Sequence, residues 1–169
     1  ERLGLEAPAP DIDLAKEKAL QRHAGTFVTL TINDTLRGCI GSLTADEPIA
    51  SSVRRNAINA AFHDPRFPPL TQKEAGDIAV EVSVLTEPQP LAYDNPQDLL
   101  GKLCPDIDGV IIKKGLSRAT FLPQVWEQLP DRQEFLSHLC SKAGLAENCW
   151  EEEALQVYTY QAQYFESSH

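Results

Sequence analysis

The segment Leu36-Arg37-Gly38-Cys39-Ile40-Gly41 contains the residues best suited to chemistry. It places the thiol of Cys39 close to the guanidinium of Arg37 and between two glycines. Positive charge favours the thiolate, the nucleophilic form of cysteine, and glycines can expose backbone N–H groups that bind anions. Cys39 is therefore a candidate nucleophile, with Arg37, Gly38 and Gly41 as binding residues. Alternatively, Cys39 is an inert buried thiol and the glycines serve a β-bulge or a close backbone approach.

Two further side chains could assist a nucleophilic cysteine. His63 is a candidate general base because an imidazole exchanges protons near neutral pH. Alternatively, it is a histidine at the end of a helix that stabilises the helix dipole. Glu81 lies on the more polar side of a predicted strand, where it could orient His63 or bind Arg37. Equally, it could face solvent, as one face of an antiparallel sheet often does. The candidate catalytic set is Cys39, His63 and Glu81.

The segment 64–70, Asp-Pro-Arg-Phe-Pro-Pro-Leu, contains three prolines. It can be neither a regular helix nor a central strand, so we expect a stiff, packed loop. Arg66 in this loop is the fourth candidate binding residue, because its planar fork could clamp a carboxylate or phosphate. Alternatively, Arg66 pairs with Asp64.

The elements that must position these residues follow from hydrophobic periodicity. Alternating β-branched residues predict a strand over 26–32, and the turn pair Asn33-Asp34 then leads into a return strand over 36–41. Apolar residues at helical spacing predict a helix from position 49 that stops before Asp64-Pro65. The alternation over 78–85 predicts a third strand, with Glu81 opposite its valine face.

The rest of the chain suggests an α+β fold, because strands and helices do not alternate regularly and no internal repeat appears. We expect a largely antiparallel sheet flanked by helices, with two lobes separated by the proline-rich connection over 88–96. The remaining predicted elements are a loose lead-in over 1–10, helices over 11–23, 71–76, 95–103 and 131–144, and strands over 110–112 and 155–165.

The chain of 169 residues has a formal net charge of −10 and a pI of about 4.8. This acidity opposes general binding to nucleic acids or anionic membranes, since both require attraction to fixed negative charge. A role with RNA is therefore the least favoured function. No stretch approaches the ~18 apolar residues of a membrane span, and no signal segment leads the chain. We expect a soluble, cytoplasmic protein.

The four cysteines have long spacings and no Cys-x-x-Cys pattern. We expect neither a metal site nor a disulfide framework, which is typical of small secreted domains. Cys140 falls on the apolar face of a predicted helix and is interpreted as a small buried hydrophobe. Because the phosphate-binding and dinucleotide-binding glycine patterns are absent, we also expect no cofactor.

Several segments together resemble a known family. Besides 36–41, they are 64–70, the strand that contains Glu81, Gly109-Val110-Ile111-Ile112 and Phe121-Leu122-Pro123-Gln124-Val125. In order and spacing these segments are similar to the AmmeMemoRadiSam system protein A family. The family is also named for a human protein encoded in the Alport-syndrome, midface-hypoplasia and elliptocytosis deletion region. The resemblance covers nearly the whole chain.

The resemblance implies one family domain over 1–169, two-lobed and α+β, with the Arg-Gly-Cys motif near a cleft. It implies no reaction. By association only, the family's name suggests a Memo-like protein and a radical-SAM protein as partners. Two functions remain open. The first is a cleft-bearing enzyme, or enzyme component, that uses Cys39 as a thiol nucleophile on a small-molecule or protein substrate. The second is a non-catalytic interaction module that binds a partner protein or peptide in the cleft.

Overall fold

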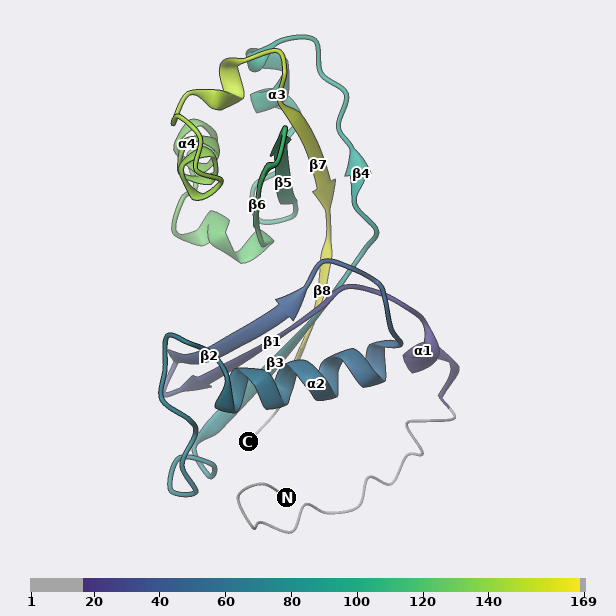
Figure 1. The fold of residues 1–169 in the computed structure, drawn as a ribbon, viewed down its shortest axis with the longest axis vertical. Coiled ribbons are helices and arrows are strands. Elements are labelled where there is room, and N and C mark those ends of the chain that lie inside the picture. Colours follow the sequence, from purple (N-terminus) through teal and green to yellow (C-terminus); the bar gives the residue numbers. More distant parts are fainter. Residues whose placement is uncertain (1–16, 168–169) are drawn as a thin grey trace. The chain divides into compact units, whose positions relative to one another are not determined.

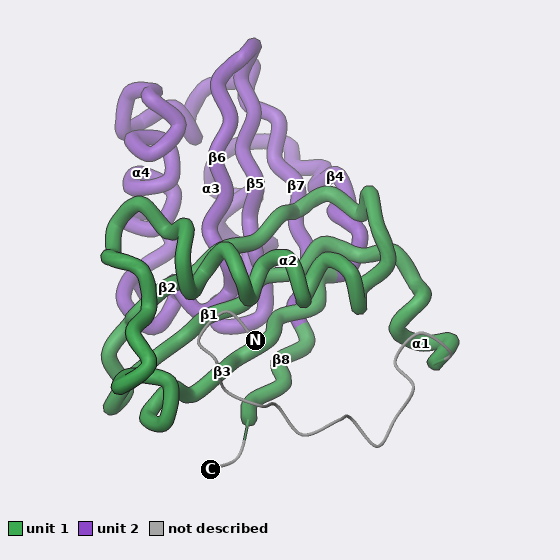
Figure 2. The backbone as a smooth tube through the Cα atoms, turned by 60° about the horizontal axis from the view of Figure 1, so that its bottom comes forward, with its two compact units in different colours: residues 1–85, 163–169 green, residues 86–162 purple. Residues whose placement is uncertain are grey.

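The computed structural model describes residues 17–167 and confirms the predicted α+β class. It contains two four-stranded sheets, with strand orders β2-β1-β3-β8 and β4-β7-β5-β6 (Figure 1). The chain divides into two compact units, residues 1–85 with 163–169 and residues 86–162 (Figure 2). The division begins at Thr86, beside the predicted proline-rich connection. The predicted lead-in over 1–10 and residues 11–16 of the predicted helix over 11–23 lie outside the described residues. In the described part, that prediction is confirmed only over α1, Lys18–Gln21, because Glu17 and Arg22 are extended.

A β-hairpin carries the Cys39 segment, as the sequence predicts. Strands β1, Thr26–Ile32, and β2, Thr35–Ser42, are joined by a tight turn in which Asn33 and Asp34 have φ angles of 49° and 61°. Positive φ at both turn positions matches the twist of paired strands. The register then shifts: Thr31 lies opposite Leu36, but Leu30 lies opposite Gly38. Arg37 is therefore the extra residue of a β-bulge.

Helix α2, Ile49–Phe62, packs across one face of this sheet (Figure 1). The apolar residues beneath it include Val28 and Leu30 of β1, which pack against Ala60. Gly38 is buried at the point where the helix crosses β2. A Cβ atom on Gly38 would lie 2.2 Å from the carbonyl oxygen of Ala60. Glycine is therefore required at this position by the closeness of two backbones.

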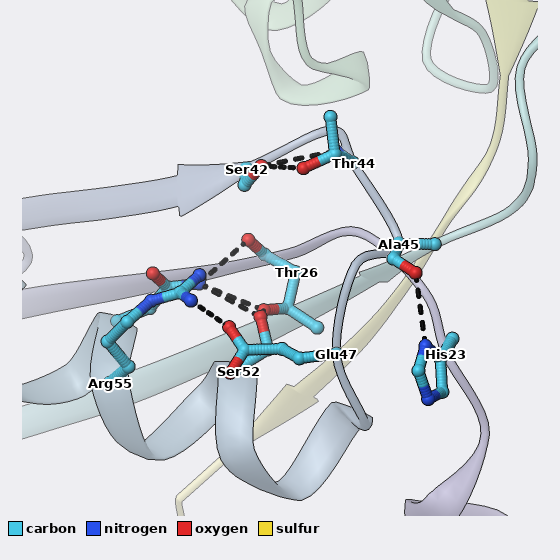
Figure 3. Close-up of polar contacts among 9 residues, drawn as sticks. His23, Thr26, Ser42, Thr44, Ala45, Glu47, Ser52 and Arg55 are labelled. Carbon is cyan, nitrogen blue, oxygen red and sulfur yellow. Dashed lines mark hydrogen bonds and ion pairs between the residues drawn. The ribbon is translucent and has the colours of Figure 1, made fainter.

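A buried polar cluster fixes α2 over β1. The hydroxyls of Thr26 and Ser52 share a hydrogen bond of 2.7 Å (Figure 3). The Asn56 amide donates to the Thr26 hydroxyl and carbonyl at 3.0 and 3.2 Å. All three side chains are buried. Water therefore cannot replace a hydrogen bond that one of them loses, and each side chain must keep its partners. This requirement specifies one position of the helix along the strand.

The predicted third strand is β3, Ile78–Leu85, which pairs antiparallel with β1. Its neighbour on the other side is β8, Ala162–Glu166. The predicted helix over 71–76 is wrong, because this segment forms successive turns. Glu74 does accept hydrogen bonds from the backbone N–H and hydroxyl of Thr71, as a helix cap would. However, a helix this short is not stable without tertiary support.

The second unit is built on β5, Gly109–Lys114, and β7, Gln156–Tyr160, with β6, Ser117–Phe121, and β4, Gln89–Pro90, at the edges. Helices α3, Pro96–Lys102, and α4, Arg132–Lys142, confirm predictions, as does β5. Short 3₁₀ helices cover Pro123–Glu127 and Cys149–Glu151. The rings of Trp126 and Phe135 stack in the core at 3.6 Å.

The predicted single strand over 155–165 is wrong, because the chain leaves β7 at Gln161 and continues as β8 in the other sheet. Alternation of apolar and polar residues shows that a segment is extended with two different faces. It does not show which sheet the segment joins.

The interpretation of the cysteines also requires correction. Cys140 is fully buried, as predicted, but it forms a disulfide with Cys149. The bond joins α4 to the following 3₁₀ helix, across a turn in which Gly144 has a φ of 76°. Both cysteines belong to the same core cluster, and their Cα atoms lie 6.0 Å apart. The two cysteines are nine residues apart, a spacing that is typical of no known cysteine motif. Their pairing therefore becomes visible only once the turn between them is known.

Within residues 17–167, no helix has the length and apolar character needed to cross a bilayer.

Substituting Gly38→Ala should destabilise the first unit by about 1–3 kcal/mol, because the new methyl group would overlap the backbone of α2. Both tryptophans lie in the second unit, so the measurement is amide hydrogen exchange of peptides from β1 and α2. Gly76→Ala is the matched control, because a Cβ atom at that position would have no other atom within 4 Å. Equal protection in the two variants would contradict the expected overlap.

Candidate active site around Cys39

The bulge places Cys39 on the face of the sheet opposite α2. Val28 and Ile40 pair across the hairpin and pack toward the helix. Since neighbouring side chains alternate between faces, Cys39 and its partner Thr29 lie on the other side. The Thr29 hydroxyl donates to Cys39 Sγ at 3.4 Å. Thr29 also lies opposite Glu81 on β3, so Cys39, Thr29 and Glu81 form one row across three strands.

The backbone of Cys39 is bound by two side chains of the 64–70 loop. Its N–H donates to Asp64 Oδ2 at 2.9 Å, and its carbonyl accepts from Arg66 Nη2 at 3.3 Å. Arg66 also donates to both carboxylate oxygens of Asp64, at 3.0 and 2.8 Å. Strand β2 is an edge strand, and the N–H and carbonyl on its open side need partners. The Asp64–Arg66 pair supplies them at Cys39.

Asp64 is ionised and almost completely buried, with 3% of its surface exposed. Hydrogen bonds from the Arg66 side chain hold the pKa of Asp64 well below its usual range, against the opposing effect of burial. Backbone N–H groups of Cys39 and Arg66 lower it further. In return, the Asp64 carboxylate raises the pKa of Arg66. The structure thus shows the pairing of Arg66 with Asp64 that the sequence left open.

Arg37 forms a second guanidinium–carboxylate pair, with Glu74. Its Nε and Nη2 donate to the two carboxylate oxygens at 2.8 and 3.3 Å. This pairing and the hydrogen bonds from Thr71 lower the pKa of Glu74 to about 2. The ring of Phe67 lies near both guanidiniums, 6.0 Å from Arg37 Cζ and 5.5 Å from Arg66 Cζ. Together the two pairs carry no net charge.

One nitrogen of Arg37 is not used by this pair. Its Nη1 is buried and has no hydrogen-bond partner among the described residues. A buried N–H group of a cation without an acceptor is costly, and such atoms in native proteins call for a missing water, ion or ligand as partner. Arg37 Nη1 is therefore one donor that the described residues do not satisfy.

The remaining candidates have local explanations in the fold. His63 ends α2, where its backbone N–H donates to the Asn59 carbonyl at 2.8 Å, and its side chain is exposed. A Cβ atom on Gly41 would lie 2.3 Å from the ring of Phe27. Gly38 and Gly41 are thus explained by packing, and their binding roles stay predictions, as does the predicted cleft beside the motif. Among residues 17–167, no three His, Cys, Asp or Glu side chains are grouped closely enough to hold a metal ion.

Three residues with clear positions in the site were not among the candidates: Thr29, Asp64 and Glu74. Counting back from the two-residue turn would pair Cys39 with Val28, because it ignores the bulge. The sequence suggests Asp64 only as a partner for Arg66, and Glu74 only as part of the predicted helix over 71–76. Asp64 bonds to a residue 25 positions away and Glu74 to one 37 positions away, so no short sequence pattern predicts these contacts. The proline-rich 64–70 segment does indicate the region.

Comparison with known proteins supports the fold. The fold is that of an α+β protein, and similar proteins occur in several archaea. The AMMECR1 family model matches residues 4–165, and the chain belongs to this family, which confirms the resemblance found in the sequence.

Relatives of known sequence match most of the chain. A protein of Methanothermobacter thermautotrophicus is 42% identical over 86% of this chain and 76% of its own length. One from Nanoarchaeum equitans is 43% identical over 91% of this chain and 86% of its own. The crystal structure of the uncharacterized protein PH0010 from Pyrococcus horikoshii is 37% identical and has a TM-score of 0.84. The match covers 94% of this chain and 81% of the chain of PH0010.

Acid should weaken the protein through the two carboxylates of this site. Their native pKa values lie below the ordinary values, so the stability they contribute is complete above about pH 4.5 and is lost as the pH falls toward 2. Asp64→Asn should reduce the free energy of unfolding at pH 7 by about 1.5–3 kcal/mol, and should make the remaining stability less sensitive to acid. Urea unfolding followed by circular dichroism at pH 7 and pH 3 measures both effects.

Asp77→Asn is the matched control, since Asp77 is an exposed residue of the same unit. If Asp64→Asn resembles this control at both pH values, the Asp64–Arg66 pair does not stabilise the strand edge.

Proposed function

We propose that the protein is an enzyme, or a component of one, in which Cys39 is the nucleophile. The observation that carries this proposal is the placement of its partly exposed thiol. The thiol accepts a hydrogen bond from Thr29 and shares a cross-strand row with Glu81. Two side chains meanwhile bind the backbone of the same residue. A nucleophile held on a rigid strand is better oriented than one on a mobile loop.

The proposed chemistry is substitution at an electrophilic carbon. The proton of Cys39 Sγ passes to Glu81 or His63, the sulfur forms a bond to the substrate carbon, and the bond from that carbon to its leaving group breaks. The leaving group then takes up the proton. The free Nη1 of Arg37 would bind an anionic group of the substrate, while Arg66 supports the strand. We infer a small-molecule or protein substrate that carries a carboxylate or phosphate.

A second candidate function is a non-catalytic interaction module. The observation that favours it is the occupation of Arg66, whose donors are taken by Asp64 and the Cys39 carbonyl. On this view the motif shapes a surface for a partner protein, and the thiol takes no part. The family's association with a Memo-like protein and a radical-SAM protein supplies two candidate partners.

Alkylation by iodoacetamide tests the nucleophile. The two free thiols are Cys39, which is partly exposed, and Cys104, which is exposed. If access alone decided the rates, Cys104 would react faster. We expect Cys39 to react faster at pH 7, because a neighbouring base that takes up the thiol proton can outweigh the poorer access of Cys39. Peptide mass spectrometry across pH 6–10 measures both sites in one sample. A Cys39 rate no greater than that of Cys104 would refute the nucleophile.

Two variants then distinguish the candidate bases. Whichever of Glu81→Gln and His63→Gln removes the proton acceptor should slow the alkylation of Cys39 at pH 7 several-fold, because the thiol proton then has no base to receive it. Glu87→Gln, an exposed glutamate outside the row, should leave the rate unchanged. If neither variant slows the reaction, neither residue is the base.

Partner capture tests the interaction module. Immobilised protein is mixed with a purified Memo-like protein, and then with a purified radical-SAM protein. In the module, Cys39→Ala should retain all of the captured partner, because the methyl group keeps the strand and removes only the sulfur. Loss of capture in Cys39→Ala, or no capture by the intact protein, would contradict the module.

A further inference from the structure

The second unit contains a pocket of about 560 Å³, lined by the connection over 90–96 and the segment 150–158. Its apolar walls include the rings of Tyr93 and Tyr158. Three lining carboxylates are exposed and form no ion pair within residues 17–167, namely Asp94, Glu151 and Glu153. The pocket therefore combines apolar walls with negative charge that the described residues do not neutralise.

The β5–β6 hairpin of the same unit has the opposite charge. Its tip is the turn Gly115-Leu116, which extends past β7 and β4 (Figure 2). The Leu116 side chain is completely exposed. Arg118 lies opposite Lys113 on the hairpin, is exposed, and forms no ion pair in the described range. A single exposed leucine is common on protein surfaces, so its significance depends on what lies beside it.

The hairpin and the pocket adjoin each other. Lys114, at the end of β5, forms an ion pair with Glu152 of the pocket lining. Lys113 Nζ lies 4.9 Å from the centre of the ring of Tyr158, which is another lining residue. The base of the hairpin is thus fixed to the pocket by two contacts. One surface of the second unit carries a basic hairpin with an apolar tip next to an acidic pocket with apolar walls.

Such a surface is complementary to a copy of itself. A twofold dimer uses the same patch on both chains, so the patch must contain both halves of the contact. Elsewhere the formal net charge of −10 opposes contact between two copies. At this patch, by contrast, the positive hairpin of one copy would meet the negative pocket of the other. Complementary charge of this kind selects one orientation of the two partners.

We propose that two copies of the chain associate through this surface, with the hairpin tip of each copy in the pocket of the other. Leu116 enters between the apolar walls, and Arg118 faces the carboxylates of Glu151 and Glu153. These groups all belong to the second unit, so the contact is independent of any chemistry at Cys39. It applies equally to an enzyme and to an interaction module.

Sedimentation equilibrium of the full chain tests this association. As the protein concentration rises from micromolar to submillimolar levels, the mass should increase from that of one chain, 18.7 kDa, to twice that value and then stop. A protein that stays monomeric over this range would overturn the proposal. So would growth beyond two chains, because a reciprocal contact is complete once one partner is bound.

Charge reversal identifies the two halves of the contact. Arg118→Glu should raise the dissociation constant of the dimer by about tenfold or more, because the change acts at both contacts. The double substitution Glu151→Lys and Glu153→Lys should do the same from the side of the pocket. An equimolar mixture of these two variants should form dimers again, because each hairpin then meets a pocket of opposite charge. A mixture that stays monomeric would overturn the proposal.

Control variants separate this contact from general effects of charge and polarity. Arg54→Glu is the control for Arg118→Glu, because Arg54 is an exposed arginine of the first unit that has no ion pair among residues 17–167. Leu116→Asp should also weaken the dimer by about tenfold or more, since it removes the buried apolar tip. Ile107→Asp should not, because Ile107 is exposed at the opposite end of β5. Dimers that respond alike to a substitution and its control would overturn the proposal.

Discussion

The β-bulge at Arg37 is the constraint on which the candidate site depends. A register without it would pair Cys39 with Val28 and turn the thiol toward α2. The extra residue shifts the pairing by one position, so Cys39 lies opposite Thr29 and faces away from the helix. Because side chains alternate along a strand, a shift of one residue exchanges the two faces. The same shift turns Gly38 toward α2, where only glycine leaves room for the Ala60 carbonyl.

The strand edge that results is completed by side chains instead of by another strand. Asp64 and Arg66 bind the N–H and carbonyl of Cys39, and Arg37 turns outward to Glu74. Both guanidiniums approach the ring of Phe67, so one aromatic residue lies near both ion pairs. This arrangement explains why the 36–41 and 64–70 segments are the two most distinctive parts of the sequence. The 36–41 segment has backbone N–H and carbonyl groups at an open strand edge. The 64–70 segment has the charged side chains that form hydrogen bonds with them.

Most of the charged groups of the site stabilise the fold. Asp64 neutralises Arg66, and Glu74 neutralises Arg37. The groups that the proposed enzyme would use are the partly exposed thiol, the carboxylate of Glu81 in the same row and one nitrogen of Arg37. An enzyme and an interaction module would use the same scaffold and differ in whether the thiol takes part. Membership of the AMMECR1 family describes the scaffold and assigns neither use.

Much of the fold could be predicted from local patterns. The hairpin, α2, β3, α3 and α4 follow from alternation, helical spacing, turn pairs and caps, because these signals arise within a few residues. The division of 155–165 between two sheets could not be predicted, since alternation shows faces and not partners. The pairing of Cys140 with Cys149 also required the chain to turn back on itself, a result of packing in a shared core.

For the site, the amino-acid order alone determined which segments matter: a thiol between glycines, a proline-rich loop with Arg66, and a polar residue at position 81. Only the tertiary structure decided how they are used. It gave Asp64 two roles, assigned Glu74 to Arg37, and brought Thr29 to the thiol. The physical reason is that each of these bonds joins residues distant in the chain. Their geometry depends on a bulge and a helix crossing, which short-range propensities do not specify.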